Sequence, residues 1–254
     1  MNSGTFDKHL ITIDIDWASD EIVDLVSGIL LSKKVKATWF ITHDSPSIRK
    51  LADYPEMFEL GLHPNFRGNS SQGSSPGQVM KYLRRILPHS EMIRTHGLVQ
   101  STDLLAELVN RFSVTVDLSL FLYNTPLITP HEIHFAKGEK SLLRIPYFWE
   151  DDHEFSAPSP CWSFNAERYH RQGLKVFNFH PAHIALNSKD DRAYSIIRDK
   201  KRIQNLTLAE IEPYINREAG TRTLFTGIAD HLAEQKETQS TIGDIAKSWR
   251  EAHE

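Results

Sequence analysis

The chain has 254 residues, of which 29 are lysine or arginine and 33 are aspartate or glutamate, for a formal net charge of −4. This near balance argues against a protein that wraps nucleic acid or coats a membrane, because both need a basic excess. A composition of 40% hydrophobic and 24% charged residues is ordinary for a globular protein. The single cysteine, Cys161, excludes a disulfide within the chain.

Short apolar segments rich in β-branched residues alternate along the chain with segments of helical periodicity. Apolar residues recur at helical spacing over 20–31, 79–87 and 102–109, and Ser101 is placed to cap the last of these helices. Strands that alternate with helices predict a parallel sheet, either closed into a barrel or open. The expected strands are 9–15, 35–41, 58–63, 92–96, 112–118, 143–147 and 174–180.

No linker divides the chain, so we expect one domain with a core over about residues 9–187. Residues 188–254 are polar and then helical, with helices expected at 206–215, 221–235 and 242–252. This helical extension is a candidate contact between the subunits of a homo-oligomer. The longest apolar run, around 29–31, is too short to cross a membrane, and no basic, apolar leader opens the sequence. We therefore expect a cytoplasmic protein.

Two acidic residues close the first expected strand, in the stretch Thr-Ile-Asp-Ile-Asp-Trp at 12–17. Side chains two residues apart lie on one face of a strand, so Asp14 and Asp16 are expected to point the same way. Neighbouring carboxylates repel one another unless a proton or a cation separates them. A strand that simply ends in solvated acidic residues would show the same pattern.

Three further strands are expected to end in histidine. A proline follows His63 and His180 directly and prevents each strand from continuing as a central one. The carboxyl ends of parallel strands form one mouth, so the histidines and the paired aspartates are expected to converge there. Each histidine alone could equally be a core residue whose hydrogen bonds are made within the protein. The occurrence of all of them at strand ends, together with the paired aspartates, favours a functional site. The polar residues at these strand ends are His63, Arg94, His96, Asn178, His180 and, just beyond, His183.

Weaker candidates for substrate contact lie near two other strands. Asp117 ends the fifth expected strand on a polar face, and the aromatic and acidic residues Trp149 and Asp151 follow the sixth. Aromatic faces beside carboxylates suit the binding of a sugar. A packed core with a solvated acidic turn gives the same pattern, and we favour that interpretation for Glu150.

The order of these motifs resembles the polysaccharide deacetylase family, the carbohydrate esterases of the NodB-homology type. The resemblance lies in Asp-Ile-Asp at 14–16, Ala-Thr-Trp-Phe at 37–40 and Glu-Leu-Gly-Leu-His at 59–63. It continues in the strand-end Arg94 and the late-strand His180, and it covers about residues 10–183. The surroundings of these last two residues look most like a subgroup found with the biosynthesis of lipopolysaccharide O-antigen.

The resemblance implies a distorted (β/α)7 barrel, a single domain with a C-terminal helical extension, that binds one divalent metal ion. By this analogy Asp14 is the general base and Arg94 orients it. Asp16 and His63 are metal ligands, and His180 is the general acid.

One position departs from the family. Where the family has a second histidine four residues after the first, this chain has Arg67, which cannot bind a metal ion. Our first choice for the third ligand is His96, because it shares a face with Arg94, and Asn65 and His183 are the alternatives. An Asp/His/His set suits Zn²⁺, and Fe²⁺ or Co²⁺ would accept the same ligands. Asn65 and His183 are otherwise expected to contact substrate, together with Asp117, Trp149 and Asp151.

The resemblance therefore implies a metal-dependent hydrolase that removes an N-acetyl group from an amino sugar, as a small molecule or within a polymer. The biosynthesis of O-antigen or another polysaccharide is the expected context. Two alternatives use the same scaffold, a hydrolase of non-sugar amides and a metal-free protein that binds carbohydrate. Arg67 at a ligand position favours the second alternative.

Overall fold

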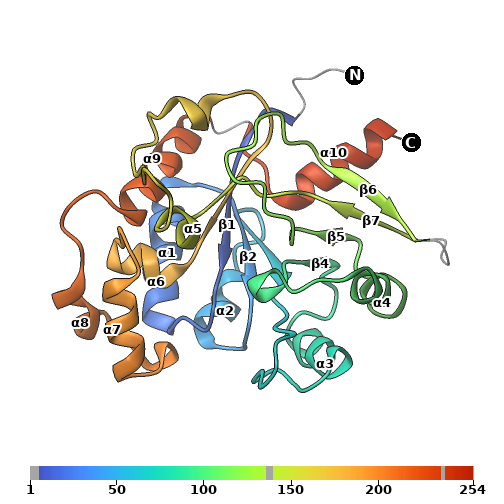
Figure 1. Ribbon diagram of the computed structural model, residues 1–254, viewed down its shortest axis with the longest axis horizontal. Coiled ribbons are helices and arrows are strands. Elements are labelled where there is room, and N and C mark those ends of the chain that lie inside the picture. Colours follow the sequence, from blue (N-terminus) through green and yellow to red (C-terminus); the bar gives the residue numbers. More distant parts are fainter. Residues whose placement is uncertain (1–5, 136–139, 236–237, 254) are drawn as a thin grey trace.

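In the residues that the computed structural model describes, 6–135, 140–235 and 238–253, nine strands form one curled sheet (Figure 1). The strand order is β6-β7-β5-β4-β3-β2-β1-β9-β8. Neighbouring strands are parallel except for the antiparallel pair of β6 and β7. The strands are β1 His9–Asp14, β2 Ala37–Ile41, β3 Phe58–Leu62, β4 Met92–Ile93, β5 Val116–Asp117, β6 His131–His134, β7 Ser141–Arg144, β8 Trp149–Glu150 and β9 Lys175–Phe179.

The segment 141–150 joins the two sides of the curled sheet. Its first part, β7, pairs with β5, and its last part, β8, pairs with β9 at the other end of the strand order. Between these parts, the amide of Tyr147 donates to the carbonyl of Leu120, and the amide of Phe148 donates to that of Val176. With β7 and β8 counted as one bent strand, seven parallel strands of the described chain surround the interior. The predicted distorted (β/α)7 barrel is therefore confirmed.

Helices connect the strands and cover the outer face of the sheet (Figure 1). The predicted cap of α4 is confirmed, because the hydroxyl of Ser101 accepts a hydrogen bond from the amide of Leu104. The helices are α1 Asp20–Lys33, α2 Pro46–Leu51, α3 Pro76–Ile86, α4 Thr102–Phe112, α5 Asp151–Glu154, α6 Pro181–Leu186, α7 Arg192–Lys200, α8 Leu208–Ile211, α9 Thr221–Glu234 and α10 Ile242–His253.

Several boundaries differ from those predicted. Helix α4 continues to Phe112, so the fifth strand is shorter than 112–118, and β4 ends at Ile93, so His96 lies in a short 3-10 turn, His96–Leu98. The helix predicted over 206–215 is broken into α8 and a 3-10 turn that contains Pro213, which cannot donate a helical hydrogen bond.

The extension after β9 packs on one side of the barrel and also closes its amino-terminal end. The ring of Phe225 in α9 lies 5.2 Å from that of Phe179, which extends outward from β9. At the start of α10, the amide of Ile242 donates to the hydroxyl of Thr38, and the amide of Gly243 donates to the carboxylate of Glu59. The carboxyl ends of the strands are thus left as the open end of the barrel.

Within the described ranges, no helix combines the length and the apolar character that a membrane crossing requires. The cytoplasmic location stays a prediction.

Candidate active site

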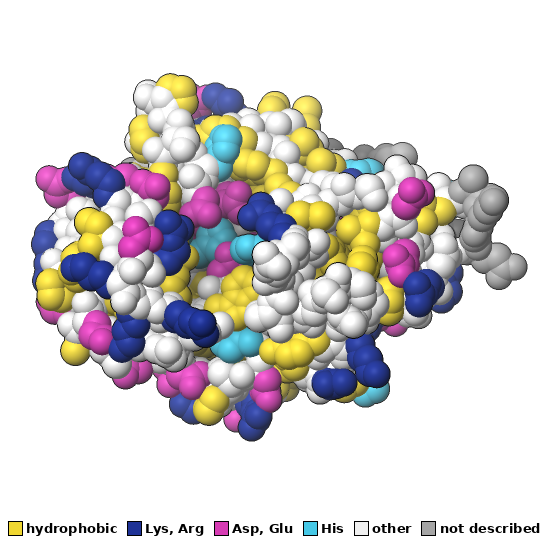
Figure 2. Space-filling model, turned by 60° about the horizontal axis from the view of Figure 1, so that its bottom comes forward, with side chains coloured by type: hydrophobic (Ala, Val, Ile, Leu, Met, Phe, Trp, Pro, Cys, Tyr) yellow, Lys and Arg dark blue, Asp and Glu magenta, His cyan; other side chains and the backbone are white. Residues whose placement is uncertain are grey.

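The strands β1 and β2 point toward the lower end of the molecule in Figure 1, and Figure 2 looks onto that end. The surface there is hollowed, and acidic and histidine side chains gather in the hollow. In the described part of the chain, residues at or just after the strand ends form three sets of candidate ligands whose atoms lie within 4.8 Å of one another. The sets are Asp16, His63 and His96; Asp14, Glu150 and His180; and Asp151, Asp152 and His180.

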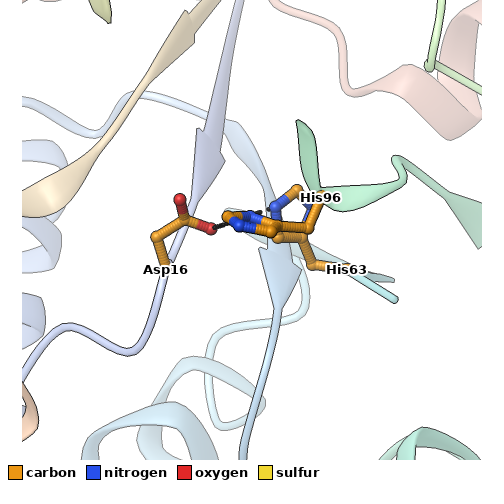
Figure 3. A group of neighbouring side chains, drawn as sticks. All are labelled: Asp16, His63 and His96. Carbon is orange, nitrogen blue, oxygen red and sulfur yellow. Dashed lines mark hydrogen bonds and ion pairs between the residues drawn. The ribbon is translucent and has the colours of Figure 1, made fainter. Parts of the chain in front are cut away.

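The first set converges on one carboxylate oxygen (Figure 3). Oδ1 of Asp16 lies 3.0 Å from Nε2 of His63 and 3.1 Å from Nδ1 of His96. On the other side of its ring, Nδ1 of His63 lies 2.7 Å from the carbonyl oxygen of Arg94. A carbonyl only accepts, so Nδ1 carries a proton. Nε2 donates to Asp16 when the ring is protonated and would present a lone pair to a cation when the ring is neutral. One carboxylate and two imidazoles in this arrangement fit a divalent cation.

Asp16, His63 and neighbouring carboxylates shift one another's pKa values. Burial by itself raises the pKa of Asp16, but the hydrogen bonds from His63 and His96 outweigh that effect and hold the pKa well below its ordinary value. Burial lowers the pKa of His63, and the nearby Asp14 and Asp16 carboxylates reverse this and raise it. The pocket therefore holds its negative charge on Asp16 and attracts positive charge to the same point, as a cation site does.

A tight turn after β1 carries Asp16 to the histidines. The strand ends at Asp14, and both Asp16 and Trp17 have positive φ, 43° and 56°. A bulky residue in this left-handed region is uncommon and costs about 1–2 kcal/mol. The amide of Trp17 donates to the hydroxyl of Thr42 at 3.1 Å and holds the turn. Asp14 and Asp16 both contact His63, but the turn, rather than the predicted strand alternation, brings Asp16 there.

Arg94 and Asn178 hold the carboxylate of Asp14. Nη1 of Arg94 donates to Oδ1 of Asp14 at 3.0 Å, and Nδ2 of Asn178 donates to Oδ2 at 2.9 Å. Arg94 also donates to the hydroxyl of Thr12 at 2.9 Å and to the side-chain oxygen of Asn178. All four side chains of this network, Thr12, Asp14, Arg94 and Asn178, are buried. This network fixes the direction of the Asp14 carboxylate within the open end of the barrel.

Two aromatic rings fix the guanidinium of Arg94. Its Cζ lies 4.6 Å from the ring centroid of Phe40 and 4.6 Å from that of Tyr147. Gly61 makes the position of Phe40 possible, because a Cβ at Gly61 would lie only 2.7 Å from that ring. The planar cation is thus held between two apolar faces, and its hydrogen-bonding edge is directed at Asp14.

Asp151 orients His180 on the opposite side of the hollow. Its Oδ1 lies 2.6 Å from Nδ1 of His180, and its Oδ2 accepts from the backbone amide of the same residue at 2.9 Å. Nε2 of His180 consequently faces Asp16, 3.6 Å from its Oδ2. Burial lowers the pKa of His180, but the carboxylates of Asp151 and Asp152 outweigh it and raise the pKa well above its ordinary value. The two carboxylates therefore favour the protonated form of the imidazole.

Of the residues expected to contact substrate, four are buried, Asp117, Trp149, Asp151 and His183, and the first three pair with other groups inside the protein. The carboxylate of Asp117 accepts from Nε of Arg144 at 2.7 Å. The indole N–H of Trp149 donates to Glu154 at 2.7 Å, and Asp151 holds His180 as described. These side chains support the walls of the site from within, because their polar atoms are already paired inside the protein.

The two alternatives for a third ligand lie outside the first set. Oδ1 of the half-buried Asn65 accepts from the amide of Arg67 at 3.0 Å. Nε2 of the buried His183 lies 2.8 Å from Asp152, and its Nδ1 lies 3.2 Å from the hydroxyl of Ser188. His96 is the candidate that meets Asp16, so the geometry favours His96 over both alternatives.

Glu150 is a site residue that the sequence interpretation missed, as is Asp152 in the third set. Glu150 was expected in a solvated turn, and it lies half-buried with its carboxylate near Asp14 and His180. Its Oε1 accepts from Nδ2 of Asn178 at 3.1 Å, and burial raises its pKa to about 7. The period of the strand explains its position, because Trp149 packs against Phe177 and Phe179 on the outer face and its neighbour Glu150 points to the inner face.

Comparisons with known proteins agree with this architecture. The sequence profile of the WbmS-like polysaccharide deacetylases matches residues 11–198. The crystal structure of WbmS from Bordetella bronchiseptica, provisionally described as a polysaccharide deacetylase involved in O-antigen biosynthesis, is 26% identical, with a TM-score of 0.76. That match covers 89% of this chain and 90% of WbmS. A family 4 carbohydrate esterase from Bacillus anthracis is 12% identical over 96% of this chain and 84% of its own, with a TM-score of 0.48. No curated protein sequence matches the chain. The chain belongs to the WbmS-like polysaccharide deacetylase family.

Proposed function

We propose that the protein is a metal-dependent hydrolase that removes the N-acetyl group from an amino sugar. The observation that carries this proposal is the convergence of Asp16, His63 and His96 between a fixed carboxylate, Asp14, and an imidazole, His180, that Asp151 orients. Family membership supports a carbohydrate deacetylase. The similarity to WbmS supports a substrate in the biosynthesis of O-antigen or a related polysaccharide.

Asp16, His63 and His96 would hold one divalent metal ion. Their mixture of one carboxylate and two imidazoles suits Zn²⁺, and Fe²⁺ or Co²⁺ would accept the same donors. When bound, such an ion polarises the acetyl carbonyl and makes a water molecule easier to deprotonate.

Asp14 takes the proton of the attacking water, whose oxygen adds to the acetyl carbon. Arg94 and Asn178 keep the carboxylate aimed for this transfer. As the carbon–nitrogen bond breaks, His180 donates the proton on Nε2 to the leaving amine, while Asp151 holds the imidazole through Nδ1. The products are acetate and the free amino sugar.

The structure weighs against a metal-free protein that only binds carbohydrate. That alternative was favoured by Arg67 at a ligand position, but His96 supplies a third donor from the next strand end. A hydrolase of non-sugar amides would use the same residues, and the release of acetate from an N-acetylated amino sugar distinguishes the two.

The metal content of the purified protein tests the proposal. We expect one metal ion per chain, and His63→Ala is expected to weaken metal binding by at least about tenfold, because it removes a ligand. The matched control is His89→Ala, which changes an exposed histidine after α3 and should keep the metal. Wild-type protein that neither contains a metal ion nor takes up Zn²⁺ from solution would contradict the proposal.

A further inference from the structure

Arg67 is an exposed residue beside the proposed metal ligands. Its Nη2 lies 3.5 Å from the carbonyl oxygen of Gly97, the residue that follows His96. Within residues 6–135, 140–235 and 238–253, no carboxylate lies within 4.0 Å of its guanidinium, whereas Arg94 and Arg144 each pair with a buried aspartate. The guanidinium of Arg67 therefore has N–H donors that a ligand could use.

The loop that carries Arg67 is fixed to the site. Nε2 of the buried Gln72 donates to the carbonyls of Thr42 at 2.8 Å and His63 at 3.1 Å. Oε1 of Gln72 accepts from the amide of Asn65 at 2.7 Å, and Oδ1 of Asn65 accepts from the amide of Arg67 at 3.0 Å. Two buried or half-buried amide side chains thus hold the backbone of Arg67 in place relative to His63.

Gly97 leaves the space that the guanidinium occupies. A Cβ at this position would lie 1.9 Å from Nη2 of Arg67, and the φ of Gly97 is +59°, in the left-handed region that favours glycine. The guanidinium thus lies across the backbone directly after His96.

Trp17 flanks the same histidine. Its half-exposed indole meets the imidazole of His96 edge to face, with ring centroids 5.3 Å apart. An aromatic face packs well against the apolar face of a sugar ring, and Trp17 is held in place by the turn after β1. We call Trp17, His96 and Arg67 the His96 edge.

We propose that the His96 edge binds the sugar ring of the substrate and that Arg67 pairs with an anionic group on that sugar, a carboxylate or a phosphate. This inference rests on the proposed function and narrows its substrate class. A guanidinium binds both anions through two parallel hydrogen bonds. Arg94 already pairs with Asp14, whereas Arg67 is an exposed arginine beside His96 whose guanidinium can meet an anion.

Binding is measured by calorimetry on Zn²⁺-loaded protein that carries Asp14→Asn, so that turnover does not interfere. The ligands are methyl N-acetylglucosaminide, the same glycoside oxidised at C6 to the carboxylate, and N-acetylglucosamine 1-phosphate. We expect at least one anionic ligand to bind about tenfold more tightly than the neutral one. The anionic ligand that binds more tightly shows whether the site prefers a carboxylate or a phosphate.

Substitutions assign the preference to Arg67. Arg67→Gln is expected to abolish the preference, so that the three ligands bind that variant with equal affinity, while Arg67→Lys keeps part of it. The control Arg85→Gln, which changes another exposed arginine, on α3, keeps all of it. Trp17→Ala is expected to weaken all three ligands alike. Equal affinity for the three ligands, or a preference that survives Arg67→Gln, would overturn the proposal.

Acetate release by the Zn²⁺-loaded wild-type protein separates this inference from the proposed function. Anionic ligands that bind through Arg67 but release no acetate would contradict the deacetylase and leave the anion subsite standing. Acetate released at equal rates from neutral and anionic sugars would support the deacetylase and reject the subsite.

Discussion

The two ends of the barrel hold carboxylates in opposite settings. At the end closed by α10, Glu59 accepts only from neutral donors, the amide of Gly243 at 3.0 Å and the hydroxyl of Thr38 at 2.9 Å, and burial raises its pKa. At the open end, Asp16 accepts from two imidazoles, and its pKa lies well below the ordinary value. The partners of a carboxylate, more than its depth, decide whether it carries charge.

This difference separates a part of the barrel that maintains the fold from a part that performs chemistry. Glu59 accepts hydrogen bonds from neutral donors and does not require a cation nearby. The open end gathers carboxylates and imidazoles that could hold a cation. Substitutions that change one carboxylate at each end should therefore have unequal effects, and three such tests follow from the largest to the smallest.

Asp14→Asn should give the largest effect. The amide occupies the volume of the carboxylate but cannot accept the proton of water, so we expect acetate release to fall by about 10³-fold. The metal content should stay at the wild-type level, because Asp14 is not among the proposed ligands. Both quantities are measured on the same preparation. Near-normal turnover would show that another group, with Glu150 the nearest candidate, acts as the base.

Asp151→Asn should give an intermediate effect. The negative charge of Asp151 is the largest influence that raises the pKa of His180, so its removal lowers that pKa. His180 then loses its proton at a lower pH, and the alkaline limb of the pH–rate profile moves to lower pH. We expect the rate at neutral pH to fall by about tenfold to a hundredfold.

Asp152→Asn serves as the comparison for that variant. Its side chain is 57% exposed, so solvent screens its charge and the limb should move less. If the pH–rate profile of Asp151→Asn equals that of the wild type, His180 is not the general acid.

Glu59→Gln should give the smallest effect. Because burial raises the pKa of Glu59 above its ordinary value of 4.5, its contribution to stability is full below that value and is lost as the pH rises through the folded pKa. Glutamine removes this dependence, so the free energy of unfolding at pH 7 should be unchanged or higher by less than about 1 kcal/mol. Thermal unfolding between pH 4 and pH 8 measures this. Loss of activity or metal in this variant would show that the two ends are coupled.

Local sequence pattern was sufficient to predict a parallel sheet and the convergence of its polar ends, and the resemblance to the deacetylase family implied that the sheet closes into a barrel. Each apolar run that ends in His63 or His180 is followed by proline, and in a parallel sheet such ends must meet at one mouth. The alternation of residues also put Arg94 on the face that reaches Asp14.

The remaining features depend on contacts that a short pattern does not contain. Asp117 and Arg144 are 27 residues apart, and only the folded chain shows that they pair with each other. The left-handed turn at Asp16 breaks the strand alternation, and sequence spacing cannot measure the distance that it spans. The antiparallel strand β6 is a short, half-exposed edge strand, so it lacks the apolar run that marks the others.

The contact between Gly61 and Phe40 constrains how this site can evolve. A larger residue at 61 would displace the ring of Phe40, and a smaller residue at 40 would uncover one face of the guanidinium of Arg94. Neither position can change size alone without disturbing the charge partner of Asp14. Across relatives, the two positions are therefore expected to covary, and a paired replacement at both should be tolerated better than either single one.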